Sequence, residues 1–541
     1  MKGTLKRCFL GLVATVLVLT VGAASAQGLW YKEVERDGRI YVFNTAKKLD
    51  AWQKSGDMGV AITLVGHGPN GETVVAENEM AIDLYNLKHD RPPYNRPPAP
   101  KPSAAEESSP LQFKIGSATI QPLGFMDFTG MYRSTDVGSG IGTNFGSIPY
   151  GTTSYQGNLS ETRFSMQNSR VGFRVDADVK SSHVMGYMEA DFLGNNGGNV
   201  AVSTNSNTFR SRLFFVDLRN HDFEIALGQL WSLVTPGRTG ISTLPGDLFY
   251  TQVIDVNYQA GLFFGRIPEL RFVYHPSNQV ALALALDSPE QYVGGSAGGS
   301  LVTFPAALSN YPGGQLNNGS TTLGVPNQVP DVIVKVAFDP SRRFHIELGG
   351  VGREFKVYNT NDGSNYTATG GGAFLNFNVE LVKNFRLIAA GFISDGGGRY
   401  IFGQAPDVIA RADGSLSPVK SRSTVSGFEY NDGITQLYAY YGGIAVDQNV
   451  TMDTNGKLVG YGYDGSPSGQ NRTIQEGTIG FSQTFWKDAK YGSLALMGQY
   501  SYLSRIPWYI PSGSPSDAHL NMVYLNVRYT LPGAAPAMGI K

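Results

Sequence analysis

The chain has 541 residues, of which 41% are hydrophobic and only 16% are charged, and its formal net charge at pH 7 is -1. This near-neutral balance gives no sign of nucleic-acid binding. The low charge combines with 67 Gly, 28 Tyr and 29 Phe, a composition that suits many strands joined by polar loops. The length allows either several ordinary domains or one very large barrel.

The first residues have the pattern of a secretory signal peptide. Basic residues precede an apolar run over 9–21, and Ala24-Ser25-Ala26 supplies a small-residue cleavage site, so we predict removal of residues 1–26. The single cysteine, Cys8, lies in this segment, so the mature chain can use neither disulfides nor thiol chemistry. No other apolar run approaches the roughly 20 residues of a membrane helix, and a membrane location would therefore require a closed barrel.

Residues 27–88 predict a small α+β module in the order ββαββα. Strand pairs flank the turns Asp37-Gly38 and Pro69-Asn70-Gly71, and helices are predicted over 46–54 and 77–88. The second helix carries three apolar residues on one face, Met80, Leu84 and Leu87. A core of about 60 residues is marginal, so docking or oligomerisation would support it. Residues 89–110 contain seven prolines and predict a semi-rigid linker.

From 111 to 531 the sequence alternates apolar and polar residues in one segment after another. We predict strands at 119–133, 163–179, 183–193, 208–219, 222–230, 268–275, 279–287, 331–338, 343–357, 371–382, 384–394, 433–440, 444–452, 472–485, 491–503 and 520–531. Tight turns alternate with long loops, including 395–432, and this asymmetry with an even strand number is typical of an outer-membrane barrel.

The predicted fold is therefore all-β: a transmembrane antiparallel β-barrel of about 16 strands over 111–531, followed by a tail at 532–541. Both ends of such a barrel lie in the periplasm, which places the module at 27–88 there too. A soluble sandwich also alternates, so the signal peptide, the strand number and the loops carry the assignment.

The hairpin at 170–194 has the clearest faces. Val171 and Phe173 lie on its apolar face, and Arg170 and Arg174 lie on its polar face. In the last strand, Val523, Leu525, Val527, Tyr529 and Leu531 are expected to face lipid, with Tyr524, Asn526 and Arg528 toward the lumen. Arg163 and Arg170 are an odd number of positions apart, so strict alternation would place them on opposite faces of one strand. We therefore predict a bulge in strands 163–179 and 208–219.

With the segments SRVGFRVDADV, YMEADFLG, RLFFVDLRN and GQLWSLVTPGR, the chain resembles Gram-negative trimeric porins, and most of all the DcaP-like porins. The resemblance covers 111–531 and is strongest between Arg163 and Arg238. It implies a homotrimer in outer-membrane lipid whose water-filled channels pass small hydrophilic solutes. The chain departs from that family where residues follow Leu531 and where 28–88 show no heptads of a coiled coil.

In porins the third long loop folds into the lumen, and here that loop is 231–267. It carries apolar residues that are unusual on an exposed loop, among them Phe249 and Phe263, and the inward Ala281, Ala283 and Ala285 leave space for it. Candidate pore-lining or constriction residues are Arg170, Arg174, Glu189, Asp191, Arg210, Arg212, Arg238, Asp247 and Asp255. In the alternative interpretation these charges pair along a solvated wall, and the loop covers the rim or a trimer interface.

The sequence contains no convincing catalytic motif. A G-x-S-x-G match at 294–298 lies in a Gly/Ser loop and not on a strand-to-helix turn, and the seven histidines lack metal-ligand spacing. We therefore predict no enzyme activity, cofactor or metal, and a passive channel. The alternative is a structural outer-membrane anchor whose periplasmic module at 28–88 binds peptidoglycan or a periplasmic protein.

Overall fold

The computed structural model describes residues 30–59, 61–92, 110–149, 154–194, 208–295, 301–319 and 324–533. The predicted signal peptide lies outside these ranges, as do most of the predicted linker and most of the predicted tail. The chain divides into two compact units, residues 1–106 and 107–541, and each is described by itself. Among the described residues, no helix is both long enough and apolar enough to cross a membrane.

The first unit has the predicted order ββαββα. Its elements are β1 (Lys32–Arg36), β2 (Arg39–Phe43), α2 (Ala46–Ser55), β3 (Ile62–Leu64), β4 (Thr73–Ala76) and α3 (Glu79–Lys88). The sheet order is β1-β2-β4-β3, and its two central strands are parallel. The left-handed Gly56 (φ 72°) ends α2, and the Asn78 side chain caps α3 by accepting the Ala81 N–H at 3.0 Å.

The two helices of this unit bury different sets of side chains against the sheet. Trp52 of α2 packs with Phe43 and Val75, whereas Ile82 and Tyr85 of α3 belong to a second cluster. The apolar face predicted for the second helix is largely left open, since Met80 is 58% exposed and Leu87 is 77% exposed.

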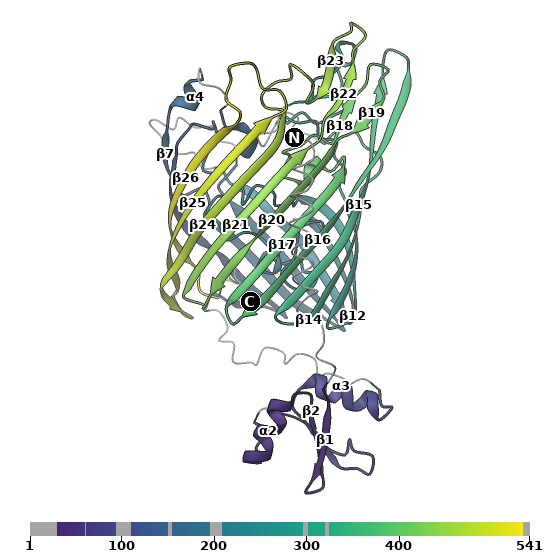
Figure 1. Ribbon diagram of the computed structural model, residues 1–541, viewed down its shortest axis with the longest axis vertical. Helices are drawn as coiled ribbons and strands as arrows, with labels where there is room; N and C mark the ends of the chain where they lie inside the picture. The colour runs from purple at the N-terminus through teal and green to yellow at the C-terminus, as the bar shows by residue number, and fades with distance from the viewer. Residues whose placement is uncertain are drawn as a thin grey trace. The chain divides into compact units, whose positions relative to one another are not determined.

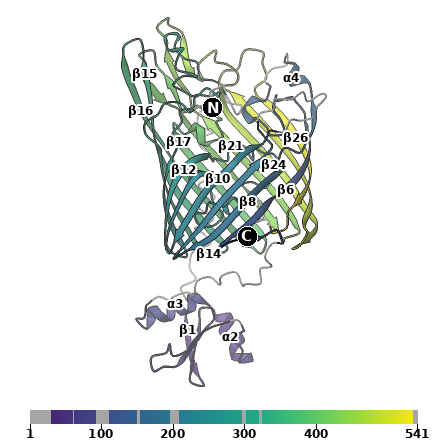
Figure 2. The ribbon, with the colours of Figure 1, turned by 180° about the vertical axis from the view of Figure 1, so that it is seen from behind.

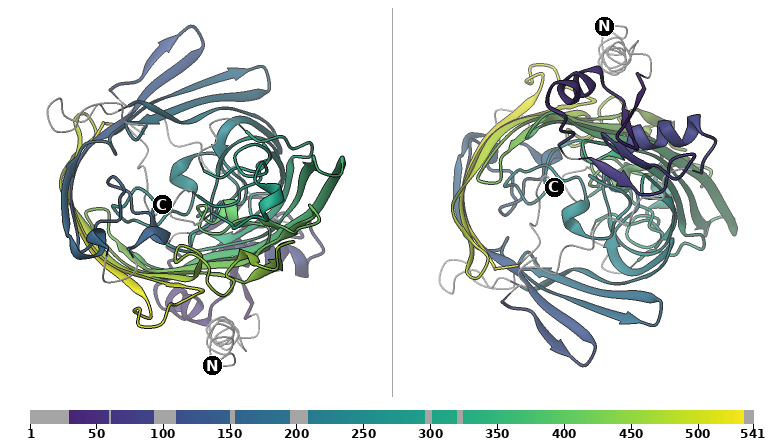
Figure 3. Two further views of the ribbon diagram at one scale, coloured as in Figure 1. Left: turned by 90° about the horizontal axis from the view of Figure 1, so that it is seen from above. Right: turned by 90° about the horizontal axis from the view of Figure 1, so that it is seen from below.

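The second unit is a closed antiparallel barrel (Figures 1 and 3). Its sixteen wall positions are β6 (Ala118–Arg133), β7 with β8 (Glu161–Ser165 and Arg170–Val179), β9 (Ser182–Asp191), β10 (Arg210–Asn220), β11 (Phe223–Trp231), β12 (Arg266–Ser277), β13 (Val280–Asp287), β14 (Asp331–Ser341), β15 (Phe344–Asn359), β16 (Ser364–Val382), β17 (Phe385–Asp395), β20 (Lys420–Asn431), β21 (Thr435–Val446), β24 (Asn471–Asp488), β25 (Gly492–Pro507) and β26 (Ala518–Thr530). The predicted number of strands is confirmed. The barrel closes where β26 pairs with β6, for example Val523 opposite Tyr132.

The two strands for which we predicted a bulge are both irregular. β7 and β8 form one wall position, because both pair with the same side of β6, through Glu161 opposite Arg133 and Arg170 opposite Phe125. The register of β10 against β9 shifts between Ser211 and Leu213. β6, β8 and β10 can be followed on the face shown in Figure 2.

One strand assignment was wrong although the total was right. β20 lies inside the predicted loop 395–432, and the predicted strands 433–440 and 444–452 are in fact β21 plus β22 (Asn449–Met452). β22 pairs only with β23 (Leu458–Tyr461), outside the barrel. The sequence of β20, KSRSTVSGFEYN, is polar on both faces at its start, so it has little alternation to detect. Gly442-Gly443 interrupts the pattern of β21.

The connections differ at the two ends of the barrel. At one end, which we call the short-turn end, tight reversals place Lys180, His221 and Asn384 at φ of 55°, 53° and 67°. At the other, the long-loop end, the connections carry structure of their own, such as α4 (Tyr155–Asn158) and the hairpin of β18 (Val408–Ala410) with β19 (Leu416–Pro418). This is the predicted alternation of short and long connections.

The outward face of the barrel is apolar, as predicted. Phe173 is 43% exposed and Val523 is 47% exposed, whereas the neighbouring Tyr524 is 1% exposed and Asn526 is fully buried. A closed barrel whose exposed side chains are apolar and whose inward side chains are polar is suited to lipid outside and water inside.

Replacing Phe173 with Arg tests this assignment of faces. We expect Phe173→Arg to lower the free energy of unfolding by about 2–4 kcal/mol, because a charge near the bilayer midplane must leave water. Val179→Arg is the matched control beside the turn, with an expected cost of about 0–1 kcal/mol. Equilibrium unfolding in lipid vesicles measures both, and equal costs would contradict the depth and the face assigned to Phe173.

Candidate functional site

The connection between β11 and β12, residues 232–265, lies inside the barrel. Most of its residues are buried, and several of its backbone N–H groups donate to inward side chains of the wall. In Figure 3 loop chain is seen within the outline of the strands. We call this segment the inner loop. Its path explains the apolar residues that the sequence placed in a surface connection.

The first half of the inner loop is fixed to β15 and β16. The Gly237 N–H donates to the Glu347 carboxylate at 2.8 Å, and the Asn376 amide donates to the Gly237 carbonyl at 2.7 Å. Asn378 donates to the Arg238 carbonyl at 3.1 Å. These inward polar side chains therefore complete the hydrogen bonding of loop backbone that has left water.

The second half is fixed to strands on the far side of the barrel. The Gln252 N–H donates to the Tyr440 hydroxyl at 3.0 Å, and the Ala260 N–H donates to the Glu476 carboxylate at 2.8 Å. The Ile254 N–H donates to the Gln499 side chain at 2.5 Å. The inner loop thus spans the lumen between β15 and β25, and does not follow one stretch of wall.

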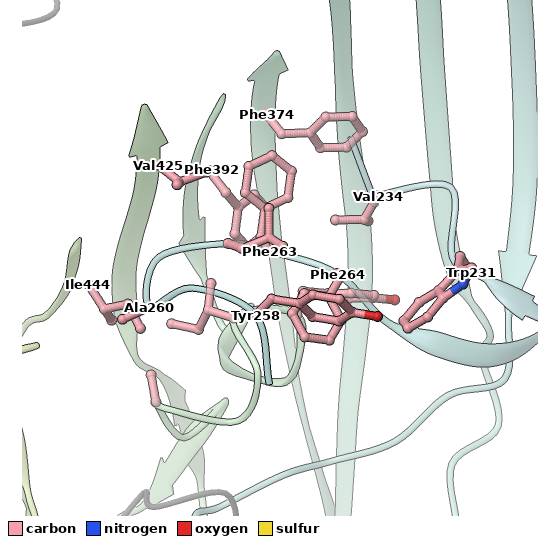
Figure 4. Close-up of a cluster of buried hydrophobic side chains, with 14 of the residues drawn as sticks. Trp231, Val234, Tyr258, Ala260, Phe263, Phe264, Phe374, Phe392, Val425 and Ile444 are labelled. Carbon is pink, nitrogen blue, oxygen red and sulfur yellow. The ribbon is translucent and has the colours of Figure 1, made fainter. Parts of the chain in front are cut away.

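Aromatic side chains hold the middle of the inner loop against the wall (Figure 4). Phe263 lies with its ring centroid 5.5 Å from Phe392 and 6.0 Å from Phe374. Tyr258 stacks on Tyr250 at 4.7 Å. Offset and edge-to-face contacts of this kind add about 0.5–1.5 kcal/mol each beyond the buried area.

The loop also approaches the wall at backbone distance. A Cβ at Gly442 would lie 1.8 Å from the Ala260 carbonyl oxygen, so this position of β21 requires glycine. The inward Ala281, Ala283 and Ala285 of β13 are buried, as expected for a wall covered from inside.

Four of the predicted pore residues form one ionic cluster on β9 and β10. Arg212 donates to Glu189 at 2.6 Å and to Asp191 at 2.9 Å, and Arg210 donates to Asp191 at 2.7 Å. Arg170 of β8 joins them, with a guanidinium nitrogen 3.6 Å from Glu189. These groups form ion pairs with one another, and Glu189, Asp191 and Arg212 are buried.

The other predicted residues lie apart from that cluster. Arg174 pairs with Asp176 on its own strand at 2.7 Å. Asp247 is buried and accepts the Ser242 hydroxyl at 2.9 Å, and Asp255 accepts the Tyr524 hydroxyl at 3.0 Å. Both aspartates thus fix the inner loop in place.

Arg238 is a deeply buried anchor of the inner loop. Its guanidinium makes two hydrogen bonds to Glu429 of β20, at 2.9 and 2.8 Å, and a third to the Tyr250 carbonyl at 3.0 Å. Burial acts to lower the pKa of Arg238, but the Glu429 carboxylate outweighs it and raises the pKa above its ordinary value. Arg238 is therefore charged, and its charge is used to attach the loop.

A cavity of about 370 Å³ lies beside the inner loop and the β9–β10 cluster. Four arginines from three separate segments line it, Arg210 and Arg212 of β10, Arg266 and Arg399, together with Glu290 as the acidic group. The aromatic side chains at its surface include Trp231, Tyr258, Tyr292 and Phe402. We call this the arginine cavity.

Arg266 and Arg399 were not among the predicted pore residues. Arg266 opens β12 and lies with its guanidinium 5.5 Å from the Trp231 ring, and within the described part of the chain it has no carboxylate within 4 Å. Arg399 comes from the connection after β17 and pairs with Asp331 at 3.1 Å. Only the closed barrel brings these segments together, so no local pattern could have identified them.

In the described part of the chain no group of three or more His, Cys, Asp and Glu is placed to hold a metal ion.

The hydroxyl of Tyr250, enclosed in the aromatic contacts of the inner loop, has its pKa raised well above the ordinary value by burial. Burial of the hydroxyl fits a packing role for that tyrosine.

Among solved structures, the chain is similar to the crystal structure of the outer membrane channel DcaP of Acinetobacter baumannii. The TM-score is 0.56 at 15% identity, over 77% of this chain and 99% of that one. Salmonella typhi OmpF (TM-score 0.42, 10% identity, 78% and 100% covered) and Pseudomonas putida OprB (0.41, 10%, 76% and 94%) are more distant. No protein-family model and no curated protein matches the chain. The DcaP likeness shows the fold, which with the apolar outward face is that of an outer-membrane barrel.

Removing the buried anchor of the inner loop should destabilise the barrel strongly. We expect Arg238→Ala to cost about 3–5 kcal/mol, because it leaves the Glu429 carboxylate buried without its cation. The matched control is Arg163→Ala, which removes a half-exposed partner of Glu161 and should cost at most about 1 kcal/mol. Thermal and urea unfolding measure both variants. Equal losses would show that the Arg238 pair does not anchor the loop.

Proposed function

We propose that the chain is an outer-membrane porin of the DcaP-like kind, through which small hydrophilic solutes diffuse passively. A sixteen-stranded barrel leaves an aqueous lumen unless something narrows it. The burial of the inner loop, and its bonds to β15, β21 and β24, support the proposal that this loop narrows the channel. This is the observation on which the proposal mainly rests.

We further propose that the arginine cavity is the part of the constriction that acts on solutes. Two of its arginines are neutralised by Asp191 and Glu189, and Arg399 by Asp331. Arg266 forms no ion pair within the described part of the chain, and Glu290 is the acidic side chain that lines the cavity. Four arginines against one glutamate line the cavity. A low-dielectric constriction lined mainly by cations attracts anions and repels cations, so the channel should favour anions.

The assembly and the module are proposed on other grounds. A homotrimer follows from the resemblance to trimeric porins, and a periplasmic module at 27–88, a linker at 89–110 and a barrel at 111–531 follow from the sequence. A second candidate role, anchoring to peptidoglycan or a periplasmic protein, is favoured by the exposed Met80 and Leu87 of α3. Exposed apolar residues on a small module often mark a binding surface.

Recording from planar lipid bilayers tests the channel. Purified, folded protein should insert and give discrete current steps in a simple salt solution, because a porin leaves a continuous aqueous path through its lumen. A variant lacking residues 27–92 should conduct equally if the module serves only attachment. Absence of any conductance from folded full-length protein would overturn the porin proposal and leave the anchor.

Reversal potentials across a salt gradient test the arginine cavity. Arg266→Gln should move the reversal potential toward cation selectivity without reducing thermal stability, since no carboxylate of the described chain would lose its cation. Arg343→Gln is the matched control, because Arg343 lies in a short turn with its side chain 71% exposed. An unchanged reversal potential for Arg266→Gln would remove this cavity from the selectivity filter.

A further inference from the structure

The outward wall of the barrel carries an apolar groove that the channel does not use. The groove measures about 1070 Å³ and runs over β11 to β16. Its lining side chains on the outward face include Phe272, Leu284, Val334 and Leu348, all of them exposed. Because this face is turned to lipid, hydrocarbon is the medium that the groove meets.

A second hollow continues the groove toward the long-loop end. It measures about 420 Å³ and shares Ala373 with the first, so the two meet at this residue of β16. Its other lining residues change from apolar to charged: Gly371 and Ile393 are followed by Asp395, Lys420 and Arg422. The combined surface is therefore amphipathic along its length: its part nearer the short-turn end is apolar, and its part nearer the long-loop end carries charged side chains.

Two opposite charges at this upper hollow form no ion pair or side-chain hydrogen bond within the described part of the chain. Lys420 is exposed, and among the described residues its ammonium makes neither an ion pair nor a hydrogen bond. Asp395 lies opposite Lys420 in the β17–β20 register and is partly exposed, and one of its carboxylate oxygens is enclosed by protein while the other is left to the hollow. Arg422, by contrast, is paired with Asp447. The hollow thus presents a cation and an anion side by side, neither of them in an ion pair with a described residue.

We propose that this surface binds a phospholipid with a phosphoethanolamine headgroup. Lys420 receives the phosphate, Asp395 receives the primary ammonium, and an acyl chain lies in the apolar groove below Ala373. A headgroup with a single negative charge would satisfy Lys420 and leave Asp395 unpaired, so the charges favour the zwitterionic headgroup. An ammonium without N–H groups could not donate a hydrogen bond to the Asp395 carboxylate.

Native mass spectrometry of the full chain in detergent tests this site. The probes are phosphatidylethanolamine, phosphatidylglycerol and phosphatidylcholine with identical acyl chains. We expect phosphatidylethanolamine to be retained about fivefold more tightly than either other lipid, the size of one good surface ion pair. Asp395→Asn should abolish this preference while leaving phosphatidylglycerol binding intact, and Lys420→Ala should weaken the binding of all three lipids.

Blocking the junction tests the groove independently of charge. Ala373→Phe should abolish retention of phosphatidylethanolamine, whereas Ala439→Phe, an exposed outward alanine of β21 outside both hollows, should not. Circular dichroism and bilayer conductance confirm that each variant is folded. Equal retention of the three lipids by the unaltered chain would overturn the proposal, as would normal retention by Ala373→Phe. A change of oligomeric state in Ala373→Phe with unchanged lipid retention would instead assign the groove to contact between copies.

Discussion

The structure depends on one constraint: a sixteen-stranded barrel encloses more space than its own side chains can fill. The wall satisfies its backbone by closing on itself, from β6 round to β26. The inner loop has no such ladder, and its buried N–H groups must find partners on the wall. Glu347, Tyr440 and Glu476 supply those partners. The loop's position and the shape of the lumen therefore follow from a few inward side chains.

Because of this constraint, the polar side chains inside the barrel have two distinct roles. Asn376 of the wall is buried and donates to the inner-loop backbone, and Arg238 of the inner loop is buried and bonds to Glu429 of the wall. These polar groups stabilise the fold. Arg210 and Arg266 line the arginine cavity and are reached by solvent. Residue type does not separate the two groups, since each contains arginines. The difference is whether the side chain meets loop backbone or open lumen.

The same distinction explains what the sequence could predict. Period-two alternation gave the lipid face of β8 and β26, and the odd parity of Arg163 and Arg170 gave the irregular strands. β20 escaped notice because its first residues are polar on both faces, and a strand without alternation resembles a loop. We also predicted two strands where the barrel has only β21. The missed strand and the extra strand cancelled, so the total of sixteen was correct although two assignments were wrong.

The candidate site was predictable only in part, for a physical reason. Glu189, Asp191, Arg210 and Arg212 lie on neighbouring strands, so pairing of those strands was enough to bring them together. Arg266 and Arg399 reach the same cavity from β12 and from the connection after β17, and their meeting depends on closure of the whole barrel. Arg238 and Asp255 were expected in the constriction, yet their charges are consumed by Glu429 and by hydrogen bonds to Tyr524. The sequence identifies which charged residues lie on the inward face, but the folded structure determines which of them are paired with another residue.

Among the arginines of the cavity, Arg266 is the one with no carboxylate partner within the described chain. A change at Arg212 removes the shorter of the two ion pairs of Glu189, and a change at Arg399 removes one of the two ion pairs of Asp331. Each of those substitutions would alter the wall and the lumen field together, because a buried charge that loses its partner is costly. At Arg266 the two effects are separable, since its charge contributes to the field of the lumen and to no ion pair. The selectivity that we propose can therefore be varied at this position without breaking an ion pair of the described chain.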